Sequence, residues 1–186
     1  MENLSMVLQH EAALLELLLF KLVETRLLLE ADEARFLPRA TREVVRARRR
    51  TREADLLRAA TVDEMAVPET GSRDAPTLRM IAAACDEPWA SIHRDHHDLL
   101  CRLVAEVEVV AHRNACLAQA AVQRLSTQEP TMSLAGVRDG RGGSTERGGA
   151  PDTDPTLVRL AQGAAYDDVL GAAANLRMPS LLAFLR

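Results

Sequence analysis

The sequence predicts an all-α protein: an elongated antiparallel bundle of three long helices, with a short helix, a flexible linker and a C-terminal helix that docks on the bundle. Leu and Ala dominate an apolar fraction of 47%, whereas aromatic residues supply only 3%. Unbranched side chains lose little rotamer freedom in a helix, while strands favour β-branched and aromatic residues. Apolar residues also recur at spacings of three and four, which places them on one helix face.

The first long helix is expected over residues 1–29. Its main leucines share one face because they recur at steps of three, four or seven: Leu8, Leu15, Leu18, Leu22 and Leu29. Leu14, Leu17 and Leu28 widen this stripe, which suits a helix that touches two neighbours. A break should follow, with Asp32 as the N-cap of the next element.

A second long helix is expected from about Glu33 or Pro38 to Ala66. Its apolar stripe consists of Leu37, Ala40, Val44, Ala47, Ala54, Leu57, Val62 and Met65. The arginines of RARRRTRE (46–53) spread over most of the helix circumference, and no aromatic residue is interleaved among them to stack on bases. This segment is interpreted as a charged outer face, and contact with nucleic acid is the alternative.

A short helix capped by Thr77 should follow, and then the longest helix, from Pro88 to Leu125 or Ser126. The apolar seam of this third long helix is the cleanest in the chain: Trp89, Ile92, His96, Leu99, Leu103, Val107, Val110, Asn114, Leu117 and Ala121. Stripes of this length can be buried only against one another, so residues 1–126 are expected to form one bundle.

The composition changes abruptly after this bundle. The segment GVRDGRGGSTERGGAPDTDP (136–155) has scarcely an apolar side chain and cannot bury enough surface to offset its chain entropy. A flexible linker is therefore expected over residues 127–155. Residues 156–175 should be helical again, and the chain closes on an apolar segment, MPSLLAFLR (178–186), which should be docked on another surface.

Several classes of function are disfavoured by composition. The formal net charge of −4 argues against a general nucleic-acid binder. Cys85, Cys101 and Cys116 are widely spaced without a CxxC pair, which suggests small buried apolar residues or free thiols in a reducing compartment. We find no secretory signal and no membrane-spanning apolar run, so a cytoplasmic protein is expected. Catalytic motifs such as GxSxG or a phosphate-binding loop are missing as well, so an enzyme is not predicted.

The histidines of HRDHH (93–97) are the most tempting candidate for a metal site. His93 and His97 lie at i and i+4, a spacing that can hold a metal on one helix face. No HExxH pattern is present, and the sequence places no third ligand. We therefore interpret them as part of a solvated face, with His96 at the edge of the core, and predict neither a metal nor a cofactor.

Asn114 is the one amide in the middle of the third long seam. A buried amide costs stability unless it is paired, and its best-attested use is to fix the alignment of neighbouring helices. Asn114 is expected to have that role. The alternative is that it contacts backbone groups of a bound peptide.

Two segments of the bundle resemble the FlgN-type flagellar export chaperones. LLELLLFKLVETRLLLEADEARFLPRATREV (14–44) is similar to the first two helices of that family. EPWASIHRDHHDLLCRLVAEVEVVAHRN (87–114) is similar to its long third helix, which carries a Trp near its start and an Asn near its end, the places of Trp89 and Asn114. The resemblance covers approximately residues 8–125.

The C-terminal segment carries a second resemblance. VRLAQGAAYDDVLGAAANLRMPSLLAFLR (158–186) is similar to the C-terminal helix of flagellin-like proteins, in particular the hook–filament junction proteins of the FlgL type. The matching residues are Ala165, Tyr166, Leu170, Ala174, Pro179, Ser180, Leu181, Leu182, Phe184 and Leu185. Ala183 departs from the pattern, since an Asp is usual there.

Together the resemblances imply a cytosolic chaperone of type III flagellar export that binds the C-terminal helices of junction proteins such as FlgK and FlgL. A client-like segment of its own would occupy the binding groove in cis. The bundle residues expected to contact a client are Leu103, Val107, Val110, Asn114 and Leu117, and the tail anchors are Leu170, Leu181, Leu182, Phe184 and Leu185. The alternative is a structural helical bundle that homo-oligomerises through its tail.

Overall fold

A computed structural model of the chain describes residues 1–65, 76–127, 154–174 and 176–186. Within these ranges every regular element is a helix: α1 (Glu2–Glu30), the short 3-10 helix η1 (Ala34–Phe36), α2 (Leu37–Met65), α3 (Leu78–Ala84), α4 (Trp89–Thr127), α5 (Pro155–Ala174) and α6 (Pro179–Leu185). The predicted all-α bundle is confirmed. Most of the predicted linker, residues 128–153, lies outside the described residues.

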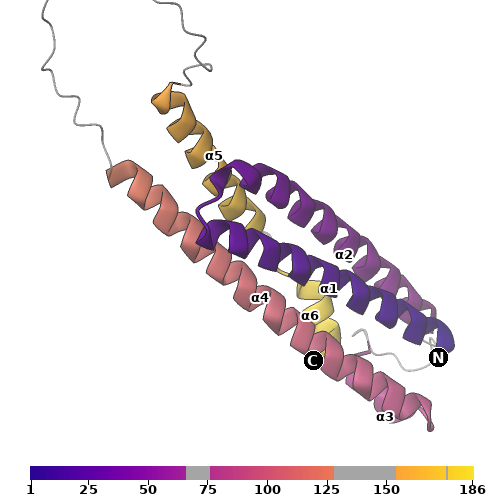
Figure 1. The fold of residues 1–186 in the computed structure, drawn as a ribbon. Coiled ribbons are helices and arrows are strands. Elements are labelled where there is room, and N and C mark those ends of the chain that lie inside the picture. Colours follow the sequence, from indigo (N-terminus) through magenta and orange to yellow (C-terminus); the bar gives the residue numbers. More distant parts are fainter. Residues whose placement is uncertain (66–75, 128–153, 175) are drawn as a thin grey trace, which may run out of the picture.

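The helices form an elongated bundle with four positions (Figure 1). α1 and α4 run in one direction, and α2 runs in the opposite direction. α5 and α6 follow each other along the fourth position, antiparallel to α4. α1 packs on α2 and α4, α5 packs on α4 and α2, and α6 contacts α3 and α4. The C-terminal segment, residues 154–186, is called the tail from here on, and it completes the bundle as its fourth member.

The predicted leucine stripe of α1 is confirmed. Its five predicted members are buried, and the three leucines that widen the stripe are half-buried, so α1 does touch two neighbours. The stripe also contains Glu11, whose side chain is fully buried. One carboxyl group therefore lies on the buried face of α1, which otherwise consists of aliphatic side chains and Thr25.

The predicted stripe of α2 is wrong at one position. Leu57 is 51% exposed, whereas its neighbour Arg58 is only 2% exposed. The buried stripe of α2 contains small and polar side chains, among them Thr41 and Thr51, whose size permits close helix contact. The Thr51 hydroxyl donates a hydrogen bond to the carbonyl oxygen of Ala47 at 3.2 Å, which satisfies this group inside the interface.

The predicted seam of α4 also needs correction. The structure buries His93, His97, Leu100, Leu103, Val104, Val107, Ala111, Asn114, Ala118 and Ala121, whereas Trp89, Ile92, His96, Leu99, Val110 and Leu117 are half-buried. The difference has a physical reason. α4 is contacted by α1, α3, α5 and α6, so its apolar surface wraps around more of the helix than a two-helix seam would.

The turn between α1 and α2 also differs from expectation. Asp32 was expected to cap the next helix, but it adopts a left-handed conformation with φ 55°. η1 begins after Glu33 without a side-chain cap. The Asp32 carboxylate instead accepts a hydrogen bond from the hydroxyl of Tyr166 in α5 at 2.9 Å. Asp tolerates left-handed backbone better than most residues, because its short polar side chain can bond locally.

Candidate helix-binding site

The site is the fourth position of the bundle, because there a helix rests on surfaces supplied by all the others. Three core clusters follow one another along the molecule, and each contains residues of the tail. The tail contributes Ala165, Tyr166 and Val169 to the first, Leu176 to the second, and Leu181, Phe184 and Leu185 to the third. The core is thus shared between bundle and tail over their whole common length.

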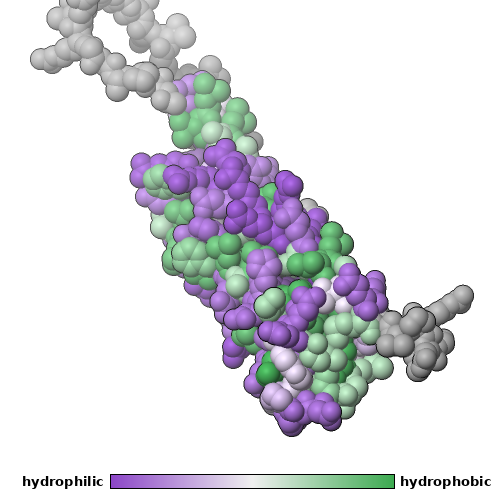
Figure 2. All heavy atoms as spheres, turned by 90° about the vertical axis from the view of Figure 1, so that its right-hand side faces the viewer, coloured by the Kyte–Doolittle hydropathy of each residue, from purple (hydrophilic) through white to green (hydrophobic). Residues whose placement is uncertain are grey.

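α5 packs on an apolar surface of alanines and leucines. Ala118 and Ala121 of α4 contact the cluster that holds Tyr166 and Val169, together with Leu37 of α2. The first turns of α5 contribute much less, since Leu157 and Leu160 are 59% and 66% exposed. Figure 2 shows hydrophobic atoms gathered at this end of the molecule. α5 is thus anchored through its second half.

α6 is short but deeply inserted. Pro179 opens it, a position where the missing N–H costs nothing. Leu181 is fully buried, and Phe184 and Leu185 are each 6% exposed. They complete a cluster built by α1, α2, α3 and α4, in which the bundle partners are Leu4, Leu8, Ala12, Leu15, Val62, Leu78, Ile81, Leu100, Leu103 and Val104. Without α6 this apolar surface would be open to water.

A buried charged cluster lies beside α6, and it consists of Glu11, Asp55 and Arg58. The Nε atom of Arg58 lies 3.1 Å from Oε2 of Glu11, and its Nη2 atom donates a hydrogen bond to Asp55. Burial raises the pKa of the Glu11 carboxyl to about 7, while the guanidinium of Arg58 opposes this rise. We refer to these three residues as the Arg58 cluster.

Two residues of α6 contact Arg58 directly. Nη2 of Arg58 donates a hydrogen bond to Oγ of Ser180 at 3.2 Å. The guanidinium carbon lies 4.4 Å from the centre of the Phe184 ring, within the range of a cation–π interaction. One buried side chain of α2 thus contacts both a hydroxyl and an aromatic ring of the tail.

His97 of α4 contacts the end of α6. Its Nε2 atom lies 3.0 Å from the carbonyl oxygen of Leu185 and 3.2 Å from Nε of Arg79. A protonated Nε2 donates to the carbonyl, whereas an unprotonated Nε2 accepts from Arg79, so the proton decides which contact is made. The interpretation of His93 and His97 as part of a solvated face is wrong, because they are 0% and 7% exposed. The half-buried His96 instead pairs with the Ser5 hydroxyl at 2.9 Å.

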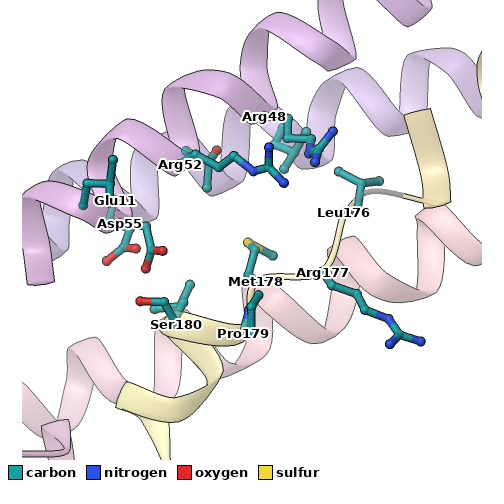
Figure 3. A pocket seen from close by; sticks show the side chains of 13 residues that line it. Glu11, Arg48, Arg52, Asp55, Leu176, Arg177, Met178, Pro179 and Ser180 are labelled. Carbon is teal, nitrogen blue, oxygen red and sulfur yellow. The ribbon is translucent and has the colours of Figure 1, made fainter. Parts of the chain in front are cut away.

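A cavity of about 300 Å³ separates α2 from the tail next to this charged cluster. Figure 3 shows Arg48 and Arg52 on its α2 side and Met178 and Pro179 on the opposite side. Asp55 and Ser180 also face the gap, whereas Arg177 points away from it. The tail therefore does not pack tightly against α2 everywhere, and there is free volume beside Ser180.

Asn114 lies in the middle of α4, but it does not contact the tail. It is 1% exposed, and its Nδ2 atom donates a hydrogen bond to the carbonyl oxygen of Leu22 in α1 at 2.9 Å. This bond ties α4 to α1 at one fixed alignment, which agrees with the role expected from the sequence.

The other predicted site residues are distributed over the three clusters. On the bundle side, Leu103, Val107, Val110 and Leu117 all belong to or pack against clusters that contain tail residues. On the tail side, Leu181, Phe184 and Leu185 are buried and Leu170 packs against the α5 cluster. Leu182 is wrong as an anchor, because it is 36% exposed on the outer face of α6.

Sequence reasoning missed Tyr166, Val169 and Leu176 as anchors of the tail, and it missed the polar contacts of Arg58 and His97. A signal for Arg58 was present, since steps of four from Ala54 to Val62 place residue 58 on the buried face of α2. The polar character of Arg58 kept it out of a search for apolar residues.

Comparison with known proteins adds no family. No protein-family model matches the chain, and neither a curated protein nor a solved structure matches it. Across the described ranges no group of three His, Cys, Asp or Glu side chains could hold a metal ion. No helix in the same ranges is long and apolar enough to cross a membrane.

Proposed function

We propose that this chain is a chaperone that holds an amphipathic helix of another protein in the fourth position of its bundle. The observation that carries the proposal is the burial of Leu181, Phe184 and Leu185 in a groove lined by four other helices. An amphipathic helix that lays its apolar face in such a groove is a recurrent mode of peptide recognition. The tail would occupy the groove in cis until a client helix replaces it.

The resemblance of the chain supplies the kind of client. Residues 8–125 resemble FlgN-type export chaperones, and the tail resembles the C-terminal helix of hook–filament junction proteins. We therefore propose a cytosolic role in flagellar export, with the C-terminal helices of FlgK- and FlgL-like proteins as clients. In support, five of the seven buried tail residues match those proteins: Ala165, Tyr166, Leu181, Phe184 and Leu185.

The test is competition between the tail and an added helix. A labelled peptide with the sequence of residues 155–186 is titrated into the wild-type chain and into the Leu181→Ala chain, and fluorescence anisotropy reports binding. Removing a buried leucine side chain costs roughly 2–5 kcal/mol, so the weakened tail should let the peptide bind at least about ten-fold more tightly. The matched control is Leu182→Ala, because Leu182 lies one residue away and is exposed.

Two results would contradict the proposal. Equal peptide affinity of the wild-type and Leu181→Ala chains would show that the tail does not guard a binding groove. A C-terminal peptide of a flagellar junction protein is the second ligand. If the junction-protein peptide fails to bind the Leu181→Ala chain while the 155–186 peptide binds, the proposal of a helix-binding groove is retained. The proposal of a flagellar client is then wrong.

The alternative is a structural bundle that oligomerises by exchanging tails between copies. Light scattering separates the two proposals without added peptide. A chaperone with its tail docked in cis stays monomeric across concentrations. Exchange of tails would give oligomers of the wild-type chain that are lost on Leu181→Ala substitution but persist on Leu182→Ala substitution.

A further inference from the structure

Of the contacts between bundle and tail, those of the Arg58 cluster are the least explained by apolar burial. Arg58 is 2% exposed and Glu11 is fully buried. Burying charges in this way costs desolvation energy, and an apolar side chain of similar volume is often as stable or more stable. The docking of α6 could be achieved by leucines alone, so the charged cluster calls for another explanation.

The contacts that Arg58 makes with α6 explain why a charged cluster is buried here. Its Nη2 atom donates to the hydroxyl of Ser180 at 3.2 Å, and its guanidinium carbon lies 4.4 Å from the centre of the Phe184 ring. Ser180 and Phe184 are four residues apart, so on one helix they lie on the same face. Glu11 and Asp55 also bind the guanidinium, Glu11 at Nε and Asp55 at the same Nη2 atom that contacts Ser180.

We infer that Arg58 is a specificity-determining residue of the groove, which selects helices with a hydroxyl residue four positions before a phenylalanine. The substrate class is therefore an apolar C-terminal helix of the pattern Ser/Thr-Leu-x-x-Phe-Leu. This inference rests on the proposed function and names the feature of the client that the groove recognises. The contact of His97 does not select among helix sequences, because it is made to the main-chain carbonyl oxygen of Leu185, which every residue type provides.

The selectivity follows from the difference between made and unmade hydrogen bonds. An apolar side chain at position 180 would remove the hydroxyl that Nη2 of Arg58 contacts at present. Nη2 would keep its bond to Asp55 and lose the partner of one of its two N–H groups, so the expected cost is that of a single hydrogen bond beside the exposed Ser180. Thr and Val have almost the same shape and both are β-branched, so they differ here only in the hydroxyl. The free volume beside Ser180 accommodates the extra methyl group of either.

The first test uses the full chain with its own tail. Ser180→Thr and Ser180→Val are compared by hydrogen exchange of the α6 amides, which reports how often α6 leaves the groove. The Val variant should open roughly three- to ten-fold more often than the Thr variant, as expected for the net contribution of one ordinary hydrogen bond. In an Arg58→Met background the two variants should open equally.

A second variant guards against loss of the fold. Arg58→Met leaves Glu11 buried without its partner, so Glu11→Gln is combined with it to remove the unpaired carboxyl group. The comparison in the chain that keeps Arg58 is decisive by itself. If α6 leaves the groove equally often in the Ser180→Thr and Ser180→Val variants of that chain, the inference is wrong. It is also wrong if their difference persists in either Arg58→Met background.

The last test asks whether the same selection acts on an incoming helix. Peptides of residues 155–186 with Ser180→Thr or Ser180→Val are titrated into the Leu181→Ala chain, and a preference for the Thr peptide is expected. Equal binding of the two peptides would overturn this inference and leave the proposed function intact. Binding of neither peptide would overturn the proposed function, and the hydrogen-exchange comparison would still decide the role of Arg58.

Discussion

The two ends of the tail are held in different ways. The α5 end packs against alanines and leucines, and long-range side-chain hydrogen bonds join Tyr166 to Asp32 and Arg159 to the carbonyl oxygen of Leu125. The α6 end inserts two leucines and a phenylalanine into an aliphatic core and also contacts two buried polar side chains, Arg58 and His97. An apolar surface accepts many helices with little regard to their sequence, whereas a buried guanidinium accepts few.

This difference separates affinity from selectivity along one groove. Apolar area stabilises docking in proportion to its extent and with little regard to sequence. Buried hydrogen-bonding groups penalise the wrong partner more than they reward the right one. On this basis the α6 end should decide which helix binds and also contribute most to its stability, and the α5 end should add affinity with less regard to sequence.

The largest effect is expected at the α6 end itself. Leu181→Ala should lower the free energy of unfolding by about 2–4 kcal/mol, because Leu181 is fully buried in the core cluster. Urea denaturation followed by circular dichroism measures this loss. The neighbouring Leu182→Ala substitution should change stability by less than about 0.5 kcal/mol. Similar losses for both variants would mean that α6 does not dock as described.

The Arg58 cluster should make stability depend on pH. The pKa of Glu11 is raised to about 7 in the folded chain by burial, above its ordinary value of 4.5. The folded state therefore binds this proton more tightly than the unfolded state, and the resulting stabilisation is present at low pH and lost as pH rises towards and through 7. A loss of about 1–3 kcal/mol between pH 5 and pH 8 is expected from this group.

Denaturant unfolding at a series of pH values checks this prediction. The Glu11→Gln variant should be markedly less sensitive to pH over the same interval, since the amide does not titrate. Glu16→Gln is the control, because Glu16 lies on the same helix and is exposed. A wild-type chain that gains stability from pH 5 to pH 8 relative to Glu11→Gln would contradict the burial-driven shift.

A smaller effect is expected at the α5 end. Tyr166→Phe removes the hydroxyl that donates to Asp32 while keeping the ring in the core. The loss should be about 1 kcal/mol, the usual net contribution of one hydrogen bond. In an Asp32→Ala background the same substitution should cost much less. Additive losses in the double variant would show that the two side chains do not interact.

The smallest effect has the opposite sign. Gly171 is an exposed residue of α5, and a methyl group added there would meet no atom within 4 Å. Gly171→Ala should therefore raise stability by up to about 1 kcal/mol through helix propensity alone. It should strengthen tail docking without altering the preference at position 180. Thermal unfolding measures the gain, and a loss of stability would mean that α5 is not helical there.

The apolar part of this architecture was predictable from the sequence. The leucines of α1 recur so regularly that their buried face follows from spacing alone, and the apolar end of the chain implied that it docks on another surface. Thr77 was also predicted correctly as a cap, since its hydroxyl accepts a hydrogen bond from the backbone N–H of Met80 at 3.3 Å. These features depend on local periodicity and local hydrogen bonds.

The polar part of the site was not predictable in the same way. Arg58 and His97 are buried because charged or polar partners from distant segments meet them, and no local pattern encodes such a meeting. Asp32 is a similar case, because its carboxylate is bound by a tyrosine far along the chain rather than by the next helix. The rotation of the α4 seam depends on α3 and α6, whose positions follow from the folded bundle.

The core cluster that joins α1 to α6 contains both Leu4 and Leu185, residues from the two ends of the chain described here. Contacts of such long sequence separation must overcome the entropy of closing nearly the whole chain, whereas α1 and α2 meet across a short turn. α6 should therefore be the last element to join the fold and the first to leave it. The groove is thus the part of the protein that is most often empty during folding and unfolding.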